Sequence, residues 1–68
     1  MINSHAAIKI IGNQPVTAVR NMVVALCLMP RMNTPEEWTR LKAGVVWLKS
    51  QHHRVPKVAT QTLKEFCK

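Results

Sequence analysis

The sequence predicts an all-α fold, a small bundle of three main helices at about residues 14–29, 34–51 and 55–67. Apolar residues recur at helical spacing within each of these segments. Turn-forming residues separate the segments, and the signals for a helix start coincide at Thr34. At 68 residues the chain is expected to form one domain, 1–68, close to the lower size limit at which a core sustains itself.

The helix at 34–51 is the best defined of the three. Thr34 and Glu37 have the spacing of a capping box, in which each side chain bonds the backbone N–H of the other residue. Pro35 falls at the first helical position, where its missing N–H costs nothing. Gly44 in mid-helix indicates a closely packed neighbour. One stripe of the helix is apolar and is expected to face the core: Trp38, Leu41, Val45 and Leu48.

The helix at 14–29 follows a turn, Gly12 to Pro15, in which Asn13 or Gln14 is expected to cap the helix. Pro30 ends it, because a proline disfavours helical geometry at the residue before it. The second half of this helix is apolar nearly all round. Such a helix is either central in the fold or a surface for self-association, so a homodimer through residues 16–29 is one expectation.

The two ends of the chain are predicted with less detail. Pro56 suits the first turn of the last helix, 55–67. Residues 6–11 are too few for periodicity to decide, so they are expected to form either a short helix or an edge strand.

The charge balance points to a polyanionic partner. Ten Lys and Arg stand against three acids, which gives a formal net charge of +7 and a pI near 10.3. Such an imbalance favours nucleic acid first, an acidic protein surface second and anionic lipid third. The bias is strongest in the second half, where Glu65 is the only acid after Arg40.

The cysteines and the apolar runs predict a soluble, cytoplasmic protein. Cys27 and Cys67 lack CxxC spacing and are expected to be reduced thiols, with a bridge between them as the alternative. The first residues lack the pattern of a signal peptide. The apolar run 22–29 is far too short to cross a membrane, so no membrane partner is expected.

The turn at Gly12 and the residues after it resemble the helix-turn-helix unit of DNA-binding proteins. Gly12, Thr17, Ala18 and Arg20 stand at compatible offsets, and the resemblance covers about residues 6–25. It departs from the pattern at Ile8, where a small residue is usual. The resemblance implies that Asn13, Gln14, Thr17 and Arg20 face DNA. The alternative is an ordinary corner between two helices that pack a core.

A second candidate is the cationic stretch from Lys49 to Lys57, where Arg54 and Lys57 lie near the start of the last helix. A helix N-terminus beside cations is a favourable phosphate site. The alternative is a solvated loop.

Trp47 lies nine residues after Trp38, about 180° away on a helix at 100° per residue. Trp47 is therefore expected on a contact surface, or else packed on the first long helix.

Chemistry beyond binding is not expected. The sequence holds no paired acids outside the capping box, no Gly-rich phosphate loop and no nucleophile with a recognisable base, so catalysis, cofactors and a metal site are not predicted.

Size and charge resemble those of small accessory proteins of phages and plasmids. The prediction is a nucleic-acid-binding accessory or regulatory protein, and the alternative is an inhibitor or adaptor that docks on an acidic surface of a host enzyme. The residues expected to bind either partner are Gln14, Thr17, Arg20, Arg40, Lys42, Trp47, Lys49, His53, Arg54 and Lys57.

Overall fold

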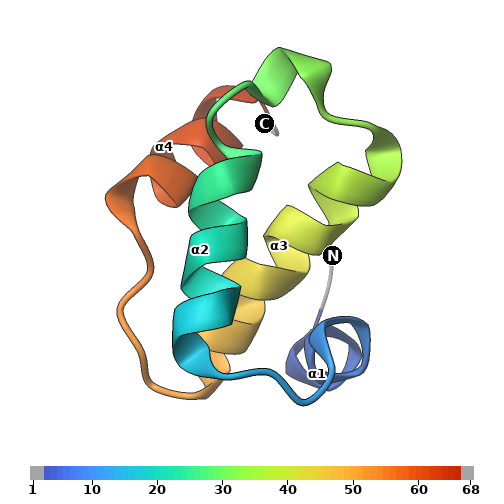
Figure 1. Cartoon of the computed structure of the whole chain (residues 1–68), viewed down its shortest axis with the longest axis vertical. Coiled ribbons are helices and arrows are strands. Elements are labelled where there is room, and N and C mark those ends of the chain that lie inside the picture. Colours follow the sequence, from blue (N-terminus) through green and yellow to red (C-terminus); the bar gives the residue numbers. More distant parts are fainter. Residues whose placement is uncertain (1–2, 67–68) are drawn as a thin grey trace.

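Four α-helices surround one shared core in the computed structural model, which describes residues 3–66 (Figure 1). They are α1 (Ser4–Ile11), α2 (Val16–Leu26), α3 (Pro35–Ser50) and α4 (Lys57–Phe66), with a short 3₁₀ helix, η1 (Pro30–Met32), between α2 and α3. The predicted all-α class is confirmed for this part of the chain. The predicted count of three main helices is not, because the N-terminal element is a fourth helix that contributes to the core.

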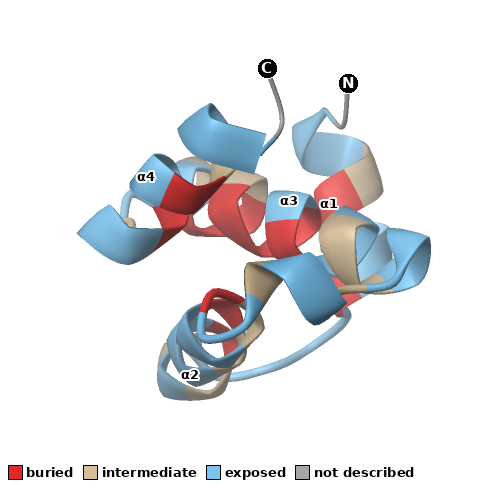
Figure 2. Ribbon diagram, turned by 90° about the horizontal axis from the view of Figure 1, so that it is seen from above, coloured by how far each residue is buried: buried red, intermediate tan, exposed pale blue. Residues whose placement is uncertain are grey.

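Helix α3 is the centre of the fold. Seen from above in Figure 2, it runs between α4 on one side and α1 on the other, with α2 across a third side. Its predicted stripe is largely confirmed, since Leu41, Val45 and Leu48 are buried and Trp38 is partly buried. Ala43, Gly44 and Trp47 are buried as well, so α3 is covered on more than one side.

The predicted start of α3 is confirmed in detail. The Thr34 N–H donates to Glu37 Oε1 at 3.1 Å, and the Glu37 N–H donates to Thr34 Oγ1 at 3.2 Å. Both halves of the capping box are therefore present, with Pro35 at the first helical position.

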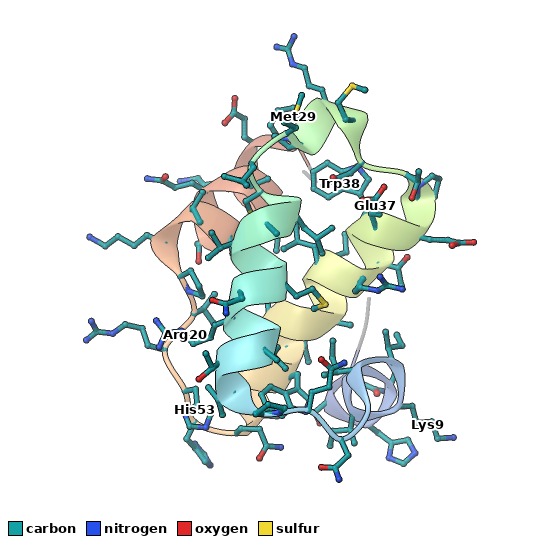
Figure 3. The ribbon with its side chains drawn as sticks, in the orientation of Figure 1. Lys9, Arg20, Met29, Glu37, Trp38 and His53 are labelled. Atoms are coloured by element: carbon teal, nitrogen blue, oxygen red, sulfur yellow. The ribbon has the colours of Figure 1, made fainter. Side chains whose placement is uncertain are left out.

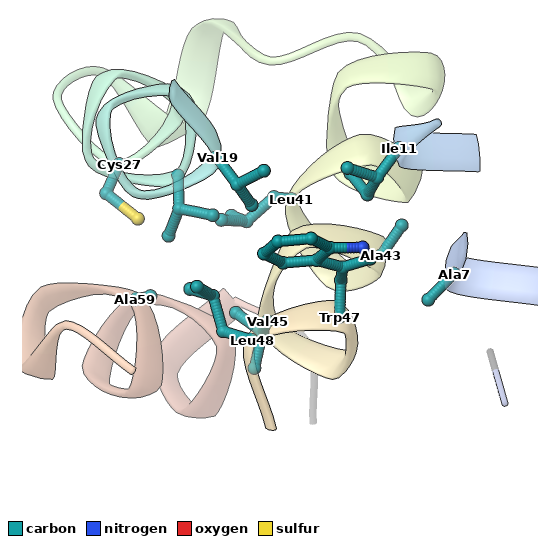
Figure 4. Close-up of a cluster of buried hydrophobic side chains, with 11 residues drawn as sticks. Ala7, Ile11, Val19, Cys27, Leu41, Ala43, Val45, Trp47, Leu48 and Ala59 are labelled. Carbon is teal, nitrogen blue, oxygen red and sulfur yellow. The ribbon is translucent and has the colours of Figure 1, made fainter. Parts of the chain in front are cut away.

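The N-terminal element is a helix, and the alternative of an edge strand is wrong. Asn3 caps α1, because its side-chain oxygen accepts from the Ala6 N–H at 2.8 Å. Ala7 and Ile11 are buried against α3. Figure 4 shows the Trp47 ring beside Ile11, on the side of α3 that α1 covers.

Helix α2 is shorter than predicted. It begins at Val16, after Pro15, and neither Asn13 nor Gln14 caps it. Instead the Gln14 Nε2 donates to the Ile11 carbonyl at 2.7 Å. At the other end, the Asn33 Nδ2 donates to the Leu26 carbonyl at 2.8 Å and satisfies one of the free carbonyls of the last turn. The helix therefore stops three residues before Met29.

One face of α2 packs on α3 at Gly44. Val19 and Val23 are fully buried on this face, and Cys27 is 7% exposed. A Cβ on Gly44 would meet Val23 Cγ2 at 2.6 Å, so the glycine is what allows the close approach, as predicted. The expectation that α2 is central in the fold is wrong, because α3 holds that place and Val24 of α2 is 39% exposed. The alternative, a surface for self-association, stays a prediction.

Helix α4 closes the remaining side of α3. Ala59 and Thr62 are buried, and near its C-terminus Phe66 meets Trp38 with ring centroids 6.0 Å apart. The helix begins one residue after Pro56, whose carbonyl accepts from the Ala59 and Thr60 N–H groups. Cys67, the alternative partner of Cys27, lies outside the described residues.

Candidate nucleic-acid interface

The outward face of α2 carries polar and cationic side chains. Because Val19 and Val23 point into the core, the residues on the opposite side of the helix face solvent: Thr17, Arg20, Asn21 and Val24. Thr17 and Arg20 are therefore exposed, as the helix-turn-helix resemblance implies. Asn21 lies on the same face because it comes four residues after Thr17, so helical periodicity could have predicted it, but it is not among the predicted binding residues.

The chain leaves α3 through a tight turn that directs the loop toward α2. The His53 N–H bonds the Leu48 carbonyl at 2.9 Å and the His52 N–H bonds the Lys49 carbonyl at 3.1 Å. This pair of bonds is a Schellman motif, and His52 occupies its left-handed position with φ 62°. Residues 51–56 then run back beside the lower part of α2 (Figure 1).

The loop and α2 meet in one shallow hollow. Pro56 from the loop lines it together with Thr17, Arg20, Asn21 and Val24 from α2. Pro56 lies between Arg54 and Lys57 in the sequence, and both of those residues are exposed. Figure 3 shows Arg20 and His53 at the same end of the molecule. Through Pro56 the loop thus adjoins the exposed face of α2. We give the name cationic surface to Thr17, Arg20 and Asn21 of α2 together with His53, Arg54 and Lys57, which lie within three residues of Pro56 in the sequence.

The acids lie away from this surface. Glu36 and Glu37 are in the first turn of α3, and Glu65 is in the last turn of α4. Both of those helix ends lie at the opposite end of the molecule from the loop 51–56, and Figure 3 shows Glu37 there. The charge of the chain is consequently uneven along its long axis, with the acids at one end and the cationic surface toward the other.

The structure brings together some, but not all, of the predicted binding residues. Thr17 and Arg20 line one hollow with Pro56, which lies between Arg54 and Lys57 in the sequence. Gln14 belongs to the α1–α2 turn, Lys49 to the last turn of α3, His53 and Arg54 to the loop after α3, and Lys57 to the start of α4. Arg40 lies in the first half of α3, and Lys42 lines a different hollow together with Trp38 and Phe66. These two residues are exposed but belong to another part of the surface.

Trp47 is not on a contact surface. Its side chain is 8% exposed and belongs to the core cluster, where α1 covers it. Trp47 does lie on the side of α3 opposite Trp38, as the angle of 100° per residue predicts. The prediction of a contact surface is wrong because the N-terminal helix occupies that side.

Metal clusters and membrane-spanning helices are both absent from the described residues. Within residues 3–66, no three His, Cys, Asp or Glu side chains lie close enough together to hold a metal ion. Among the helices of the same range, none is long and apolar enough to cross a membrane. Comparisons with protein-family models, curated proteins and solved structures find no match to this chain.

Proposed function

We propose that the protein is a small accessory or regulatory protein that binds duplex nucleic acid through the cationic surface. The observation that carries the proposal is that Arg20 on α2 lines one hollow with Pro56, the loop residue that lies between Arg54 and Lys57 in the sequence. A net charge of +7 supplies the long-range attraction, and the distance of the acids from this surface leaves that attraction undiminished there.

Phosphate contact, rather than insertion of α2 into a groove, is the mode of binding that the packing favours. In a helix-turn-helix unit the second helix enters the major groove. Here α2 lies beside the loop 51–56, and α1 and α2 each make their main packing with α3. Arg20 and Arg54 present guanidinium groups, which bind phosphate oxygens in pairs, and Lys57 adds a compact positive charge at the start of α4.

The polar neighbours have a supporting role in this proposal. The Thr17 hydroxyl and the Asn21 amide lie on the same exposed face as Arg20 and can donate to phosphate oxygens. The first N–H groups of α4 point out of its N-terminal end, which is the positive end of the helix dipole and therefore favours a phosphate. Most of these contacts go to the backbone of the nucleic acid, so the expected binding has little dependence on base sequence.

Two variants with equal loss of charge test the proposal. The first is Arg20→Ala/Arg54→Ala/Lys57→Ala, which removes three cations from the cationic surface. The matched control is Arg40→Ala/Lys42→Ala/Lys64→Ala, which removes three cations that lie elsewhere. We expect the first variant to lose roughly tenfold or more in affinity for duplex DNA at about 50 mM salt, and the control to lose far less.

Chemical-shift mapping gives an independent readout. Addition of a short DNA duplex to the labelled protein is expected to shift the amide signals of residues 17–24, 53–55, 57 and 58 and to leave those around Trp38 unchanged. Equal loss of affinity in both variants, with shifts spread over the whole surface, would contradict a defined interface and leave only non-specific attraction.

An acidic protein surface is the second partner class for the same cations. The inhibitor or adaptor hypothesis relied on Trp47 as its anchor, and the burial of Trp47 removes that anchor. A protein partner on the cationic surface would therefore bind by charge alone. Failure of duplex DNA to bind, together with binding of an acidic protein that the first variant abolishes, would favour this second function.

A further inference from the structure

A second surface lies at the opposite end of the molecule, where η1, the start of α3 and the end of α4 meet. Met29 and Met32 are 66% and 71% exposed there, on either side of Pro30 and Arg31. Figure 3 shows Met29 above Trp38 at this end. We call the hollow formed by Met29, Pro30, Met32, Trp38 and Phe66 the apolar hollow.

The apolar hollow has two connected parts. One part, of about 360 Å³, is lined by Met29, Pro30, Met32 and Phe66 together with Arg31. The other, of about 570 Å³, extends along α3 past Trp38 to Thr39 and Lys42. Pro30, Arg31 and Phe66 line both parts, so the two parts adjoin.

The local structure explains why these apolar side chains are exposed. Helix α2 ends at Leu26, whose carbonyl accepts from the Asn33 side chain, so Leu28 and Met29 lie outside the helix. η1 carries Met32, and the contacting rings of Trp38 and Phe66 line the hollow as well. Exposed apolar side chains that lie together on a small protein mark a binding surface more often than isolated ones do.

Two cations line the hollow itself. Arg31 lines both parts and Lys42 lines one. The acids that lie at the same end of the molecule, Glu36, Glu37 and Glu65, are not among the lining residues. Methionine thioethers adapt to irregular apolar partners, which is why they are common on peptide-binding surfaces. A complementary ligand thus combines a bulky apolar side chain with carboxylates on either side of it.

We propose that the apolar hollow binds an acidic segment of another protein, which inserts a Leu, Phe or Trp side chain between Met29, Met32 and Phe66 and places its carboxylates against Arg31 and Lys42. This site is separate from the cationic surface and does not depend on it. A protein that carries both surfaces would link a nucleic acid to an acidic protein segment.

Two other occupants fit the surface less well. In a symmetric pair of identical chains the same patch faces itself, so Arg31 and Lys42 would meet their own copies near the twofold axis between two chains of charge +7. Single-stranded nucleic acid needs open aromatic faces for base stacking, and here Trp38 is only partly exposed with Phe66 against it.

The two tryptophans provide a direct test, because Trp38 lines the hollow and Trp47 is buried in the core. Three nine-residue peptides with Leu, Phe or Trp at the centre of Asp and Glu residues are titrated into the labelled full chain. We expect at least one peptide to shift the indole N–H signal of Trp38 and to leave that of Trp47 unchanged. Its affinity should fall at least tenfold when the central residue becomes Ala, and again when the acids become Asn and Gln.

Two double variants separate this site from the cationic surface. Arg31→Ala/Lys42→Ala should weaken peptide binding at least tenfold and leave duplex DNA binding within threefold, whereas Arg54→Ala/Lys57→Ala should do the reverse. Both variants change only exposed residues, so each is expected to remain folded.

Four outcomes would overturn the proposal. They are the absence of any Trp38 shift with all three peptides at millimolar concentration, binding that survives replacement of the central residue, a stronger Trp38 shift with a single-stranded oligonucleotide, and a concentration-dependent dimer in sedimentation that Met29→Glu disrupts. The last two assign the hollow to nucleic acid and to a second copy of the chain, respectively.

Discussion

Replacement of Gly44 by Ala tests the packing of α2 on α3. The added Cβ would lie 2.6 Å from Val23 Cγ2 and 3.1 Å from Met22 Cε, against about 3.5–4.0 Å for ordinary carbon contacts. Met22 ends in a flexible thioether and can move aside. Val23 is fully buried and β-branched, so its side chain has essentially one rotamer in a helix and cannot move aside. Helix α2 must therefore move outward.

The expected magnitude is a balance of two terms. Ala is better than Gly in mid-helix by about 1 kcal/mol, whereas overpacking of a core typically costs about 1–3 kcal/mol. Because Val23 cannot relax, we expect the upper part of that range and a net decrease of about 1–2 kcal/mol in the free energy of unfolding. Urea titration followed by circular dichroism measures this decrease, which corresponds to a fall of roughly 4–16 °C in Tm for a domain of this size.

A double-mutant cycle identifies the cause. Val23→Ala removes the methyl group that the new Cβ would meet, so its cost should be smaller by at least about 1 kcal/mol in the Gly44→Ala background than in the wild type. An unchanged or higher stability of Gly44→Ala would refute the close approach of the two helices. Additive effects in the cycle would show that Val23 is not the residue in conflict.

Four further predictions concern single side chains. Thr34→Ala removes half of the capping box and should cost about 1 kcal/mol in chemical denaturation, whereas Thr34→Ser should restore most of it. Asn33→Ala removes the bond to the Leu26 carbonyl and should cost about 1 kcal/mol; Asn33→Asp, which lacks the donor, should cost no less, and full stability of either variant would argue against this cap. His52→Gly relieves a left-handed backbone at φ 62° and should raise the urea midpoint by the equivalent of about 0.5–1 kcal/mol, a gain that the neighbouring His53→Gly should not share. Trp47→Ala should cost about 3–5 kcal/mol, a large part of the roughly 3–10 kcal/mol expected for a chain of this length, so its circular dichroism should show substantial unfolding, and a folded Trp47→Ala would contradict the burial of the indole.

Local signals in the sequence predicted the start of α3 correctly because they depend on residues three or four apart. The capping box at Thr34 is of this kind, and a glycine in mid-helix at Gly44 is an equally local signal. The predicted end of α2 is wrong, and the carbonyl of its last residue is bonded by Asn33, seven residues beyond Leu26 and on the far side of Pro30. Nothing in the periodicity of residues 14–29 could reveal that bond.

Long-range packing explains the other errors. Residues 4–11 alone do not distinguish a helix from a strand, and the burial of Ala7 and Ile11 against α3 is what favours the helix. The same helix covers Trp47, so an indole predicted on a contact surface lies in the core. Helical periodicity predicts the angle of Trp47 around α3 but not the element that occupies that angle.

For the candidate surfaces, too, local sequence patterns were predicted correctly and long-range contacts were not. Periodicity along α2 predicted that Thr17 and Arg20 share a face, and composition predicted the cationic loop. The loop lies beside α2 because the Schellman motif at His52 directs it there. The sequence does not predict this motif, because it has His rather than Gly at the left-handed position. The apolar hollow was missed because Met29 was expected inside a helix, although two methionines on either side of Pro30 and Arg31 were a signal for it.

The salt dependence of duplex DNA binding is the most direct test of the proposed function. Anisotropy titrations at several salt concentrations give the slope of log K against log salt, which changes by about 0.9 for each phosphate that the protein no longer neutralises. We expect Arg20→Ala/Arg54→Ala/Lys57→Ala to reduce the slope of the wild type by about 2.7, and Arg40→Ala/Lys42→Ala/Lys64→Ala to reduce it by less than about 1. Equal slopes for the two variants, or no measurable binding by the wild type at about 50 mM salt, would contradict nucleic-acid binding at the cationic surface.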